Sequence, residues 1–161
     1  IRNVTLNDSS ALSELYNYFI RTSGATFDEV EITQEEMGKR IKNIHFDKHF
    51  PYLVYEEEGD VIGYAYASSF RERNAYRFTV ESTVYVNPKY FGKGVGKALY
   101  VELLSQIKSQ GFHLVVGVIT LPNEASVRLH EQMGFQKAGQ LKEVGYKFEQ
   151  WRDVGFWELL L

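Results

Sequence analysis

The chain has 161 residues, a length that fits a single domain over residues 1–161. Its formal net charge of −3 argues against non-specific nucleic-acid binding. The absence of cysteine excludes disulfides, thiolate metal sites and a cysteine nucleophile. No apolar run reaches the roughly 20 residues of a membrane span. The N-terminus has no signal-peptide pattern, so we expect a cytoplasmic protein. We assign it no metal.

The first third of the chain predicts a short strand and two helices. A strand is expected over residues 1–5. Apolar residues at helical spacing predict a helix over 8–21, and a loop is expected over 22–32. Thr33 and Glu36 have the spacing of a capping box, which predicts the start of a second helix.

The middle of the chain predicts three strands. Residues 52–56 and 61–70 are rich in strand-forming side chains, and the turn at 58–60 between them predicts a hairpin. Residues 77–86 predict a third strand, which the Asn-Pro pair at 87–88 ends.

The last third alternates helices and strands. A helix is expected from a glycine-rich loop to Gly111, followed by an apolar strand over 113–120 that suits burial on both faces. Residues 123–133 predict a short helix. Two final strands over 135–141 and 153–161 complete a mixed α+β pattern.

Three alternating glycines stand before the helix that ends near Gly111, in the run Gly92-Lys93-Gly94-Val95-Gly96-Lys97. Such a loop opens the backbone to a ligand, and the free N–H groups of the first helical turn attract an anion such as a pyrophosphate. Its two lysines add positive charge. The loop is not a Walker A sequence, because Phe91 and Ala98 replace the first glycine and the hydroxyl residue. Lys97 replaces the third glycine of a Rossmann loop. From the loop alone, a turn that binds nothing remains an alternative.

The order of these motifs resembles the GNAT superfamily of acyltransferases, in which a strand, a Q/R-x-x-G-x-G/A loop and a helix surround the coenzyme A pyrophosphate. The run at 94–96 matches the glycines, whereas Phe91 stands where that family has Gln or Arg. The chain more closely resembles phosphinothricin N-acetyltransferases and their methionine sulfone or sulfoximine relatives. The segments that carry this resemblance are 26–27, 70–86, 129–131, 134–135, 144–148 and 151–154. It implies the GNAT fold, a mixed and mostly antiparallel sheet flanked by helices, with acetyl-CoA as cosubstrate.

Glu81 is the candidate general base. Strand alternation places it with Thr83 and Tyr85 on a polar face that can line a cleft. A position in mid-strand allows its surroundings to raise its pKa. The resemblance implies the same role, since the matching glutamate of that subfamily is assigned as base. An exposed strand carboxylate is the alternative.

His130 is the second catalytic candidate. It forms one polar stripe with Asn123 and Ser126 at i, i+3 and i+7 of a helix. Histidine carries protons near neutral pH, and the resemblance implies that it takes the place of a tyrosine that protonates the leaving thiolate. A structural hydrogen bond is the alternative. The resemblance also implies that Asn123 contacts the coenzyme, and the shared stripe adds Ser126.

The strand over 77–86 is expected to bind the pantetheine arm. In GNAT folds this strand splays from its neighbour, and the arm pairs with the exposed edge. The resemblance therefore implies coenzyme contacts at Val84, Tyr85 and Val86, whose N–H groups would stabilise the thioester oxygen.

A basic, aromatic cluster precedes that strand. It comprises Arg71, Arg73, Tyr76 and Arg77, which suit a carboxylate or phosphinate of the acyl acceptor. A solvated loop is the alternative. Phe27 and Tyr85 are expected to add apolar walls around a small amino acid.

These observations predict an N-acetyltransferase that works by direct transfer in a ternary complex, because no cysteine exists to carry an acyl group. The expected acceptor is a small L-amino acid analogue such as phosphinothricin or methionine sulfone. The segment 146–154 and the 15% aromatic content predict a homodimer. Two alternatives stay open. One is a GNAT enzyme for a polyamine or a protein N-terminus, and the other is a non-catalytic acetyl-CoA-binding module.

Overall fold

Seven strands form one mixed sheet in the computed structural model, which describes residues 1–161. Their order is β1-β2-β3-β4-β5-β7-β6, and every neighbouring pair is antiparallel except the parallel pair β4 and β5. The strands are β1 (Arg2–Asn3), β2 (Tyr52–Glu57), β3 (Asp60–Ser69), β4 (Thr79–Val86), β5 (Leu114–Leu121), β6 (Gln136–Lys147) and β7 (Gln150–Leu160). The predicted mixed and mostly antiparallel sheet is confirmed.

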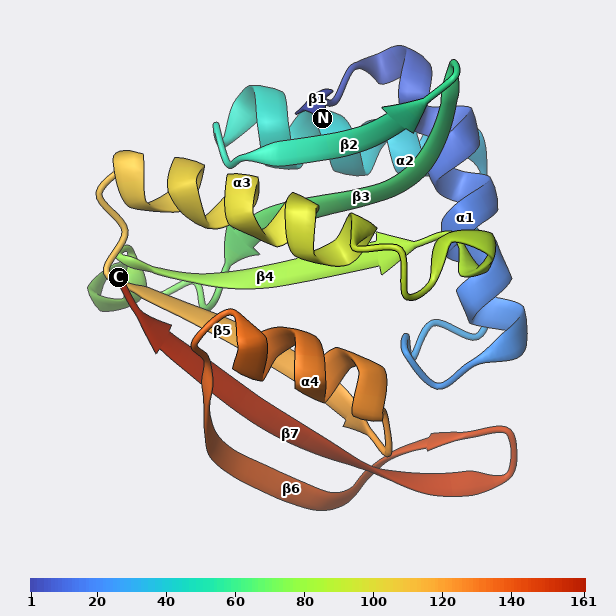
Figure 1. Cartoon of the computed structure of the whole chain (residues 1–161). Helices are drawn as coiled ribbons and strands as arrows, with labels where there is room; N and C mark the ends of the chain where they lie inside the picture. The colour runs from blue at the N-terminus through green and yellow to red at the C-terminus, as the bar shows by residue number, and fades with distance from the viewer.

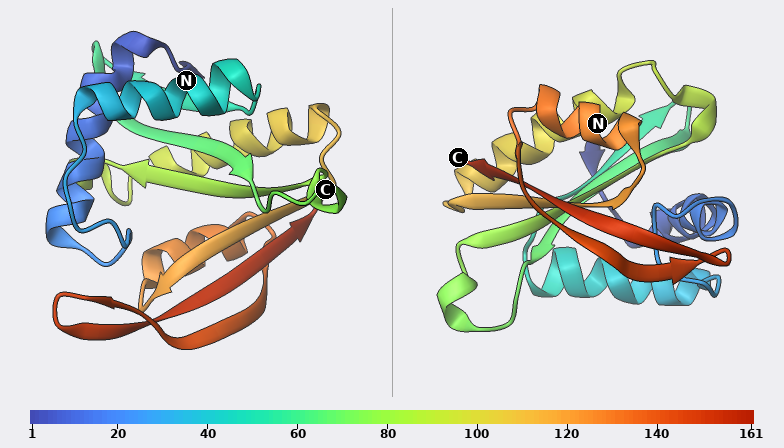
Figure 2. Two further views of the ribbon diagram at one scale, coloured as in Figure 1. Left: turned by 180° about the vertical axis from the view of Figure 1, so that it is seen from behind. Right: turned by 90° about the horizontal axis from the view of Figure 1, so that it is seen from below.

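Helices cover both faces of this sheet (Figures 1 and 2). α1 (Ser9–Thr22) and α2 (Gln34–Ile41) pack on one face, and α3 (Val95–Ser109) and α4 (Glu124–Gln132) lie on the other. The capping box at the start of α2 is confirmed, because the Thr33 N–H donates to the Glu36 carboxylate at 2.7 Å and the Glu36 N–H donates to Thr33 Oγ1 at 3.1 Å. No helix of the structure is both long and apolar enough to cross a membrane.

Two hydrophobic cores hold the layers together. The apolar stripe of α3 packs Leu99, Leu103 and Ile107 against the sheet, and all three side chains are fully buried. Each such side chain contributes about 1.5–3 kcal/mol of burial free energy. On the opposite face, α1 and α2 enclose a second core that includes Leu12 and Ile41. The two faces of β4 therefore meet different helices.

The parallel pair at the centre of the sheet is only half formed. Residues Thr79 to Ser82 pair with Leu114 to Gly117, and the pairing stops there. The second halves of β4 and β5 diverge, as the open angle between them in Figure 1 shows. The end of β4 keeps its partner on the other side, β3. One edge of β4 is thus unpaired where a ligand strand could add.

The structure corrects the predicted strands in two places. The strand predicted over 77–86 begins only at Thr79, because residues 74–76 form a 3-10 turn. The last two strands were predicted as 135–141 and 153–161, but β6 and β7 extend to a two-residue turn at Phe148 and Glu149. Both turn residues have positive φ, which normally selects glycine or asparagine. A register shift between Leu141 and Gly145 further obscures the alternation of side chains between the two faces of β6.

Candidate active site

A cleft of about 950 Å³ opens where β4 and β5 diverge. Its walls come from β4, the start of α3, α4, the end of β5 and the loop between α1 and α2. Most of the sequence-predicted site residues line it. These are Phe27, Glu81, Val84, Tyr85, Val86, Gly92, Gly94, Val95, Gly96, Lys97, Asn123, Ser126 and His130.

The N-terminus of α3 points free backbone donors into the cleft. The first hydrogen bond of the helix runs from the Ala98 N–H to the Gly94 carbonyl at 2.9 Å, so the N–H groups of residues 95–97 have no backbone acceptor. Lys97 lines the cleft beside them. This arrangement suits an anion such as a pyrophosphate.

The glycines of this loop are required by backbone conformation and by helix packing. Gly92 and Gly94 adopt φ of 75° and 84°, which other residues rarely adopt. A Cβ at Gly96 would lie 3.1 Å from Leu129 Cδ2, so this glycine lets α3 approach α4 closely. The glycine pattern therefore sets backbone shape and packing, and the anion site rests on the three N–H groups and Lys97.

Four predicted site residues do not line the cleft. The Nζ of Lys93 lies 4.7 Å from the ring centroid of Tyr90 instead. Arg71, Arg73 and Tyr76 are exposed in the segment before β4, where the Arg71 guanidinium lies 6.0 Å from the Tyr76 ring centroid. The structure does not bring this cluster to Glu81.

Glu81 occupies the middle of β4 between its register partners Ser68 on β3 and Val116 on β5. Its carboxyl group lines the cleft and is partly buried. Burial raises the pKa of Glu81, and no neighbouring charge or hydrogen-bond donor offsets that effect. A carboxylate with a raised pKa and no fixed partner is suited to accept a proton.

His130 belongs to a buried chain of hydrogen bonds that links α4, α3 and β4. Its Nδ1 lies 2.8 Å from the Ser126 carbonyl oxygen, and its Nε2 lies 2.7 Å from the Tyr100 hydroxyl. The Tyr100 hydroxyl in turn lies 3.0 Å from Ser82 Oγ. A carbonyl only accepts, so Nδ1 carries the ring proton and Nε2 accepts from Tyr100. Burial lowers the pKa of His130 and so favours the neutral ring.

The ring of His130 has little room to move, because only 3% of the residue is exposed. The Tyr100 and Phe135 rings each lie 5.1 Å from it, centroid to centroid. On the sheet side, a Cβ at Gly117 would stand 2.5 Å from both Cδ2 and Nε2 of the ring. Gly117 therefore provides the space in which His130 reaches Tyr100.

Sequence reasoning missed three members of this network, Tyr100, Ser82 and Gly117. Two of them left a signal. Gly117 is the single glycine in the apolar run 113–120, and Tyr100 puts a hydroxyl beside the buried stripe of α3. Neither signal identifies a hydrogen-bond partner, since these residues and His130 lie on four elements that are distant in sequence.

Asn123 and Ser126 are both placed at the cleft by the start of α4. The Asn123 side-chain oxygen accepts from the Ser126 N–H at 3.1 Å and so caps the helix. This use of the oxygen leaves the amide NH₂ of Asn123 as its donor toward a ligand.

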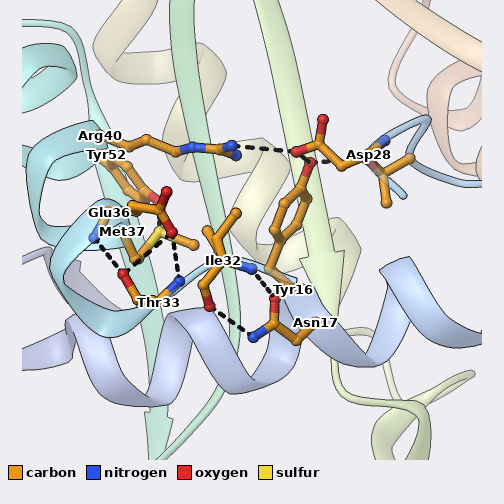
Figure 3. Close-up of polar contacts among 10 residues, drawn as sticks. Tyr16, Asn17, Asp28, Ile32, Thr33, Glu36, Met37, Arg40 and Tyr52 are labelled. Atoms are coloured by element: carbon orange, nitrogen blue, oxygen red, sulfur yellow. Dashed lines mark hydrogen bonds and ion pairs between the residues drawn. The ribbon is translucent and has the colours of Figure 1, made fainter. Parts of the chain in front are cut away.

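The loop between α1 and α2 forms the remaining wall and is held to both helices (Figure 3). The Tyr16 hydroxyl lies 2.7 Å from Thr26 Oγ1 and donates to the Asp28 carboxylate at 2.8 Å. Arg40 of α2 donates to the same carboxylate at 3.2 Å. Asn17 bonds both the N–H and the carbonyl of Ile32 at 2.9 Å.

A buried lysine holds the same loop to β6. Lys147 is only 2% exposed, and its Nζ donates to the carbonyls of Ser23 and Thr26 at 3.0 and 2.8 Å. Next to it, the Phe27 ring lies over Gly145, where any Cβ would collide with it. The loop that carries Thr26 and Phe27 into the cleft is thus attached on three sides.

No group of three or more His, Asp or Glu side chains converges on a point that could hold a metal ion. His45, whose spacing from His49 resembles a ligand pair, places its Nδ1 3.0 Å from the Phe50 carbonyl oxygen.

Comparison with known proteins gives a consistent family assignment. A family model described as an acetyltransferase (GNAT) domain matches residues 1–155. The chain is 44% identical to a phosphinothricin N-acetyltransferase of Streptomyces viridochromogenes, over 98% of this chain and 85% of that protein. It is 34% identical to the L-methionine sulfoximine/L-methionine sulfone acetyltransferase of Salmonella typhimurium, over 100% of this chain and 94% of that protein. The crystal structure of a GNAT superfamily phosphinothricin acetyltransferase from Sinorhizobium meliloti in complex with acetyl-CoA superposes with a TM-score of 0.95 at 38% identity, covering 99% of this chain and 86% of that one.

Proposed function

The chain belongs to the GNAT family of acetyltransferases, and from this premise we propose that it transfers acetyl from acetyl-CoA to the amine of a small L-amino acid analogue such as phosphinothricin or methionine sulfone. The observation that carries this proposal is the cleft at the divergence of β4 and β5. It combines an anion-binding helix start with a partly buried carboxylate on the adjoining strand. We take residues 1–161 to act as one catalytic domain.

The residues of the cleft fit coenzyme A. The free N–H groups of residues 95–97 and the ammonium of Lys97 suit its pyrophosphate. The unpaired edge of β4 at residues 84–86 suits an extended arm that carries amide groups. The Asn123 amide offers a further donor. When bound, acetyl-CoA supplies the acetyl thioester.

Glu81 is the proposed base. The acceptor's ammonium must lose a proton before its nitrogen can attack, and the raised pKa of Glu81 makes this carboxylate a better proton acceptor. Backbone N–H groups on the free edge of β4 are fixed donors for the thioester oxygen as it gains charge. Phe27 and Tyr85 supply apolar walls that exclude water from the reacting amine.

His130 and Tyr100 are proposed to act as one unit. The only ring proton of neutral His130 is held by the Ser126 carbonyl, so the proton available in this network is that of the Tyr100 hydroxyl. Nε2 of His130 accepts from that hydroxyl and orients it, and the proton stays on Tyr100 because burial raises the pKa of Tyr100 and lowers that of His130. The pair thus offers a reservoir for the proton that the leaving thiolate requires.

We also propose that the protein works as a homodimer. The hairpin of β6 and β7 exposes a row of large apolar side chains, each 49–62% accessible, and exposed apolar patches of this kind mark protein interfaces. They are Leu141, Val144, Tyr146, Phe148 and Trp151. Arg71 and Arg73 remain the proposed clamp for the acceptor's carboxylate. They do not line the cleft of their own chain, so we propose that they act at the cleft of the other copy.

The test measures thiol release from acetyl-CoA with phosphinothricin, methionine sulfone and spermidine as acceptors. Glu81→Gln should lower kcat on the amino acid analogues about 10²–10⁴-fold, the usual contribution of a general base, and leave acetyl-CoA binding intact. The exposed Glu102→Gln serves as the matched control. Unchanged turnover in Glu81→Gln would refute the base assignment. Tight acetyl-CoA binding without turnover on any amine would instead favour a binding module.

A further inference from the structure

Arg152 of β7 is a cation that no acidic group of the chain neutralises. It takes part in none of the seven ion pairs of the structure. Its Nε is buried and finds no hydrogen-bond acceptor, and it is the single buried side-chain nitrogen or oxygen of which this is true. Buried donors are nearly always paired, so an orphaned one calls for an explanation.

The neighbouring charged groups are already engaged. Asp153 accepts from Gln140 at 2.7 Å and from the Glu143 N–H at 2.8 Å. Lys147, another cation beside the α1–α2 loop, donates to the carbonyls of Ser23 and Thr26. Lys147 is thus a structural residue, and Arg152 is the one that keeps donors to offer.

Arg152 borders the acceptor side of the cleft. Arg152 is not itself among the residues that line the cleft, but residues two apart on a strand share a face, so it lies beside Val154, which does line the cleft. Its register partner on β6 is Gly145, the residue over which the Phe27 ring lies. A Cβ at Gly24 would stand 3.8 Å from its Nε. The guanidinium stem is therefore enclosed by the loop that forms the acceptor wall.

The position along the sheet decides which part of an acceptor Arg152 can reach. Glu81 is level with Val116 on β5, whereas Asp153 is level with Leu121. Arg152 therefore lies several residues beyond the level of Glu81, toward the end of the sheet where β4 and β5 diverge. The amine and the carboxylate of an amino acid share one carbon and must both stay near Glu81. Only the far end of the acceptor's side chain can extend toward Arg152.

We propose that Arg152 binds an oxyanion at the end of the acceptor's side chain, such as a phosphinate, and so sets the preference for anionic over uncharged analogues. A planar guanidinium with fixed donors matches two oxygens on one phosphorus. The inference rests on the proposed function and adds to it a subsite separate from Arg71 and Arg73, which are assigned to the carboxylate that all amino acid acceptors share.

Phosphinothricin and methionine sulfone separate the two sites, because the first ends in a charged phosphinate and the second in an uncharged sulfone. Arg152→Met should raise KM for phosphinothricin roughly tenfold or more, the expected loss for a charge-assisted hydrogen bond. KM for methionine sulfone should rise less than about threefold, and KM for acetyl-CoA should not change. Calorimetric titration of phosphinothricin into the coenzyme A complex should show the same loss of affinity.

Arg152→Gln keeps a polar side chain in the partly buried position and carries the same expectation, should the methionine variant fold poorly. Arg21→Met removes an exposed arginine paired with Glu31 and is the matched control. Equal losses for both acceptors, or no loss for either, would overturn the inference and leave the proposed function intact. A wild-type enzyme that acetylates neither analogue would overturn the proposed function itself.

Discussion

Replacing Gly117 by alanine should disrupt the hydrogen-bond network of His130, Tyr100 and Ser82 without replacing any of these three side chains. The new methyl carbon would lie 2.5 Å from Cδ2 and Nε2 of His130, closer than non-bonded atoms approach. The ring cannot retreat, because Tyr100 and Phe135 pack against it and the Ser126 carbonyl holds Nδ1. We expect the His130 ring to shift and its bond to the Tyr100 hydroxyl to break.

The cost follows from two contributions. Overpacking a closed core costs about 1–3 kcal/mol, and leaving a buried hydroxyl or ring nitrogen unpaired costs about 1–3 kcal/mol more. For a chain of this length, each kcal/mol lowers Tm by roughly 2–4 °C, so the loss should be on the order of 10 °C. If His130 and Tyr100 serve the leaving thiolate, kcat should fall as well.

Thermal unfolding, steady-state kinetics and nitrogen-15 NMR of the histidine rings test this expectation together. Gly139→Ala is the matched control, because a Cβ at Gly139 meets no atom within 4 Å. Adding His130→Ala to Gly117→Ala should cost less stability than His130→Ala alone, since the clash is then gone. A Gly117→Ala variant with the wild-type Tm, kcat and His130 ring spectrum would refute the argument.

Three further results are expected. The kcat/KM of the wild type should fall as pH drops through the raised pKa of Glu81, because only its deprotonated form accepts a proton, and a pH-independent rate would contradict this. Lys147→Met should raise KM for the acceptor and spare that for acetyl-CoA, with the exposed Lys142→Met as control. Equal changes in KM for the acceptor and for acetyl-CoA would mean that Lys147 stabilises the fold in general. In sedimentation the wild type should have the mass of a dimer, and Trp151→Glu should shift it toward the monomer. A monomer mass for the wild type as well as for the variant would refute the dimer.

Features with a local cause could be predicted from the sequence. The apolar stripes of α1 and α3 predicted those helices, and Thr33 with Glu36 predicted the start of α2. Strand alternation separated the face of Glu81 from that of Val80, and the family resemblance then singled out Glu81 as the candidate base. These predictions hold because the interactions involved span only a few residues.

Features that depend on contacts between distant elements could not be predicted. Whether Lys93 or Lys97 faces the cleft depends on where the loop turns against β4, and both fit the same pattern. The role of Lys147 requires the carbonyls of a loop more than a hundred residues earlier. The full length of β6 and β7 escaped detection because their turn uses Phe148 and Glu149 in place of glycine or asparagine.

The attachments of the α1–α2 loop have a consequence for the kinetics of acceptor binding. Tyr16, Asn17, Arg40 and Lys147 fix this segment from three directions through hydrogen bonds within the chain. A wall that is already ordered requires little loss of conformational entropy when a molecule binds. Acceptor association should therefore follow a single bimolecular phase, without a slow step of loop closure. Discrimination between amino acids would then be expressed at the moment of entry, by the shape and charge of a rigid cavity.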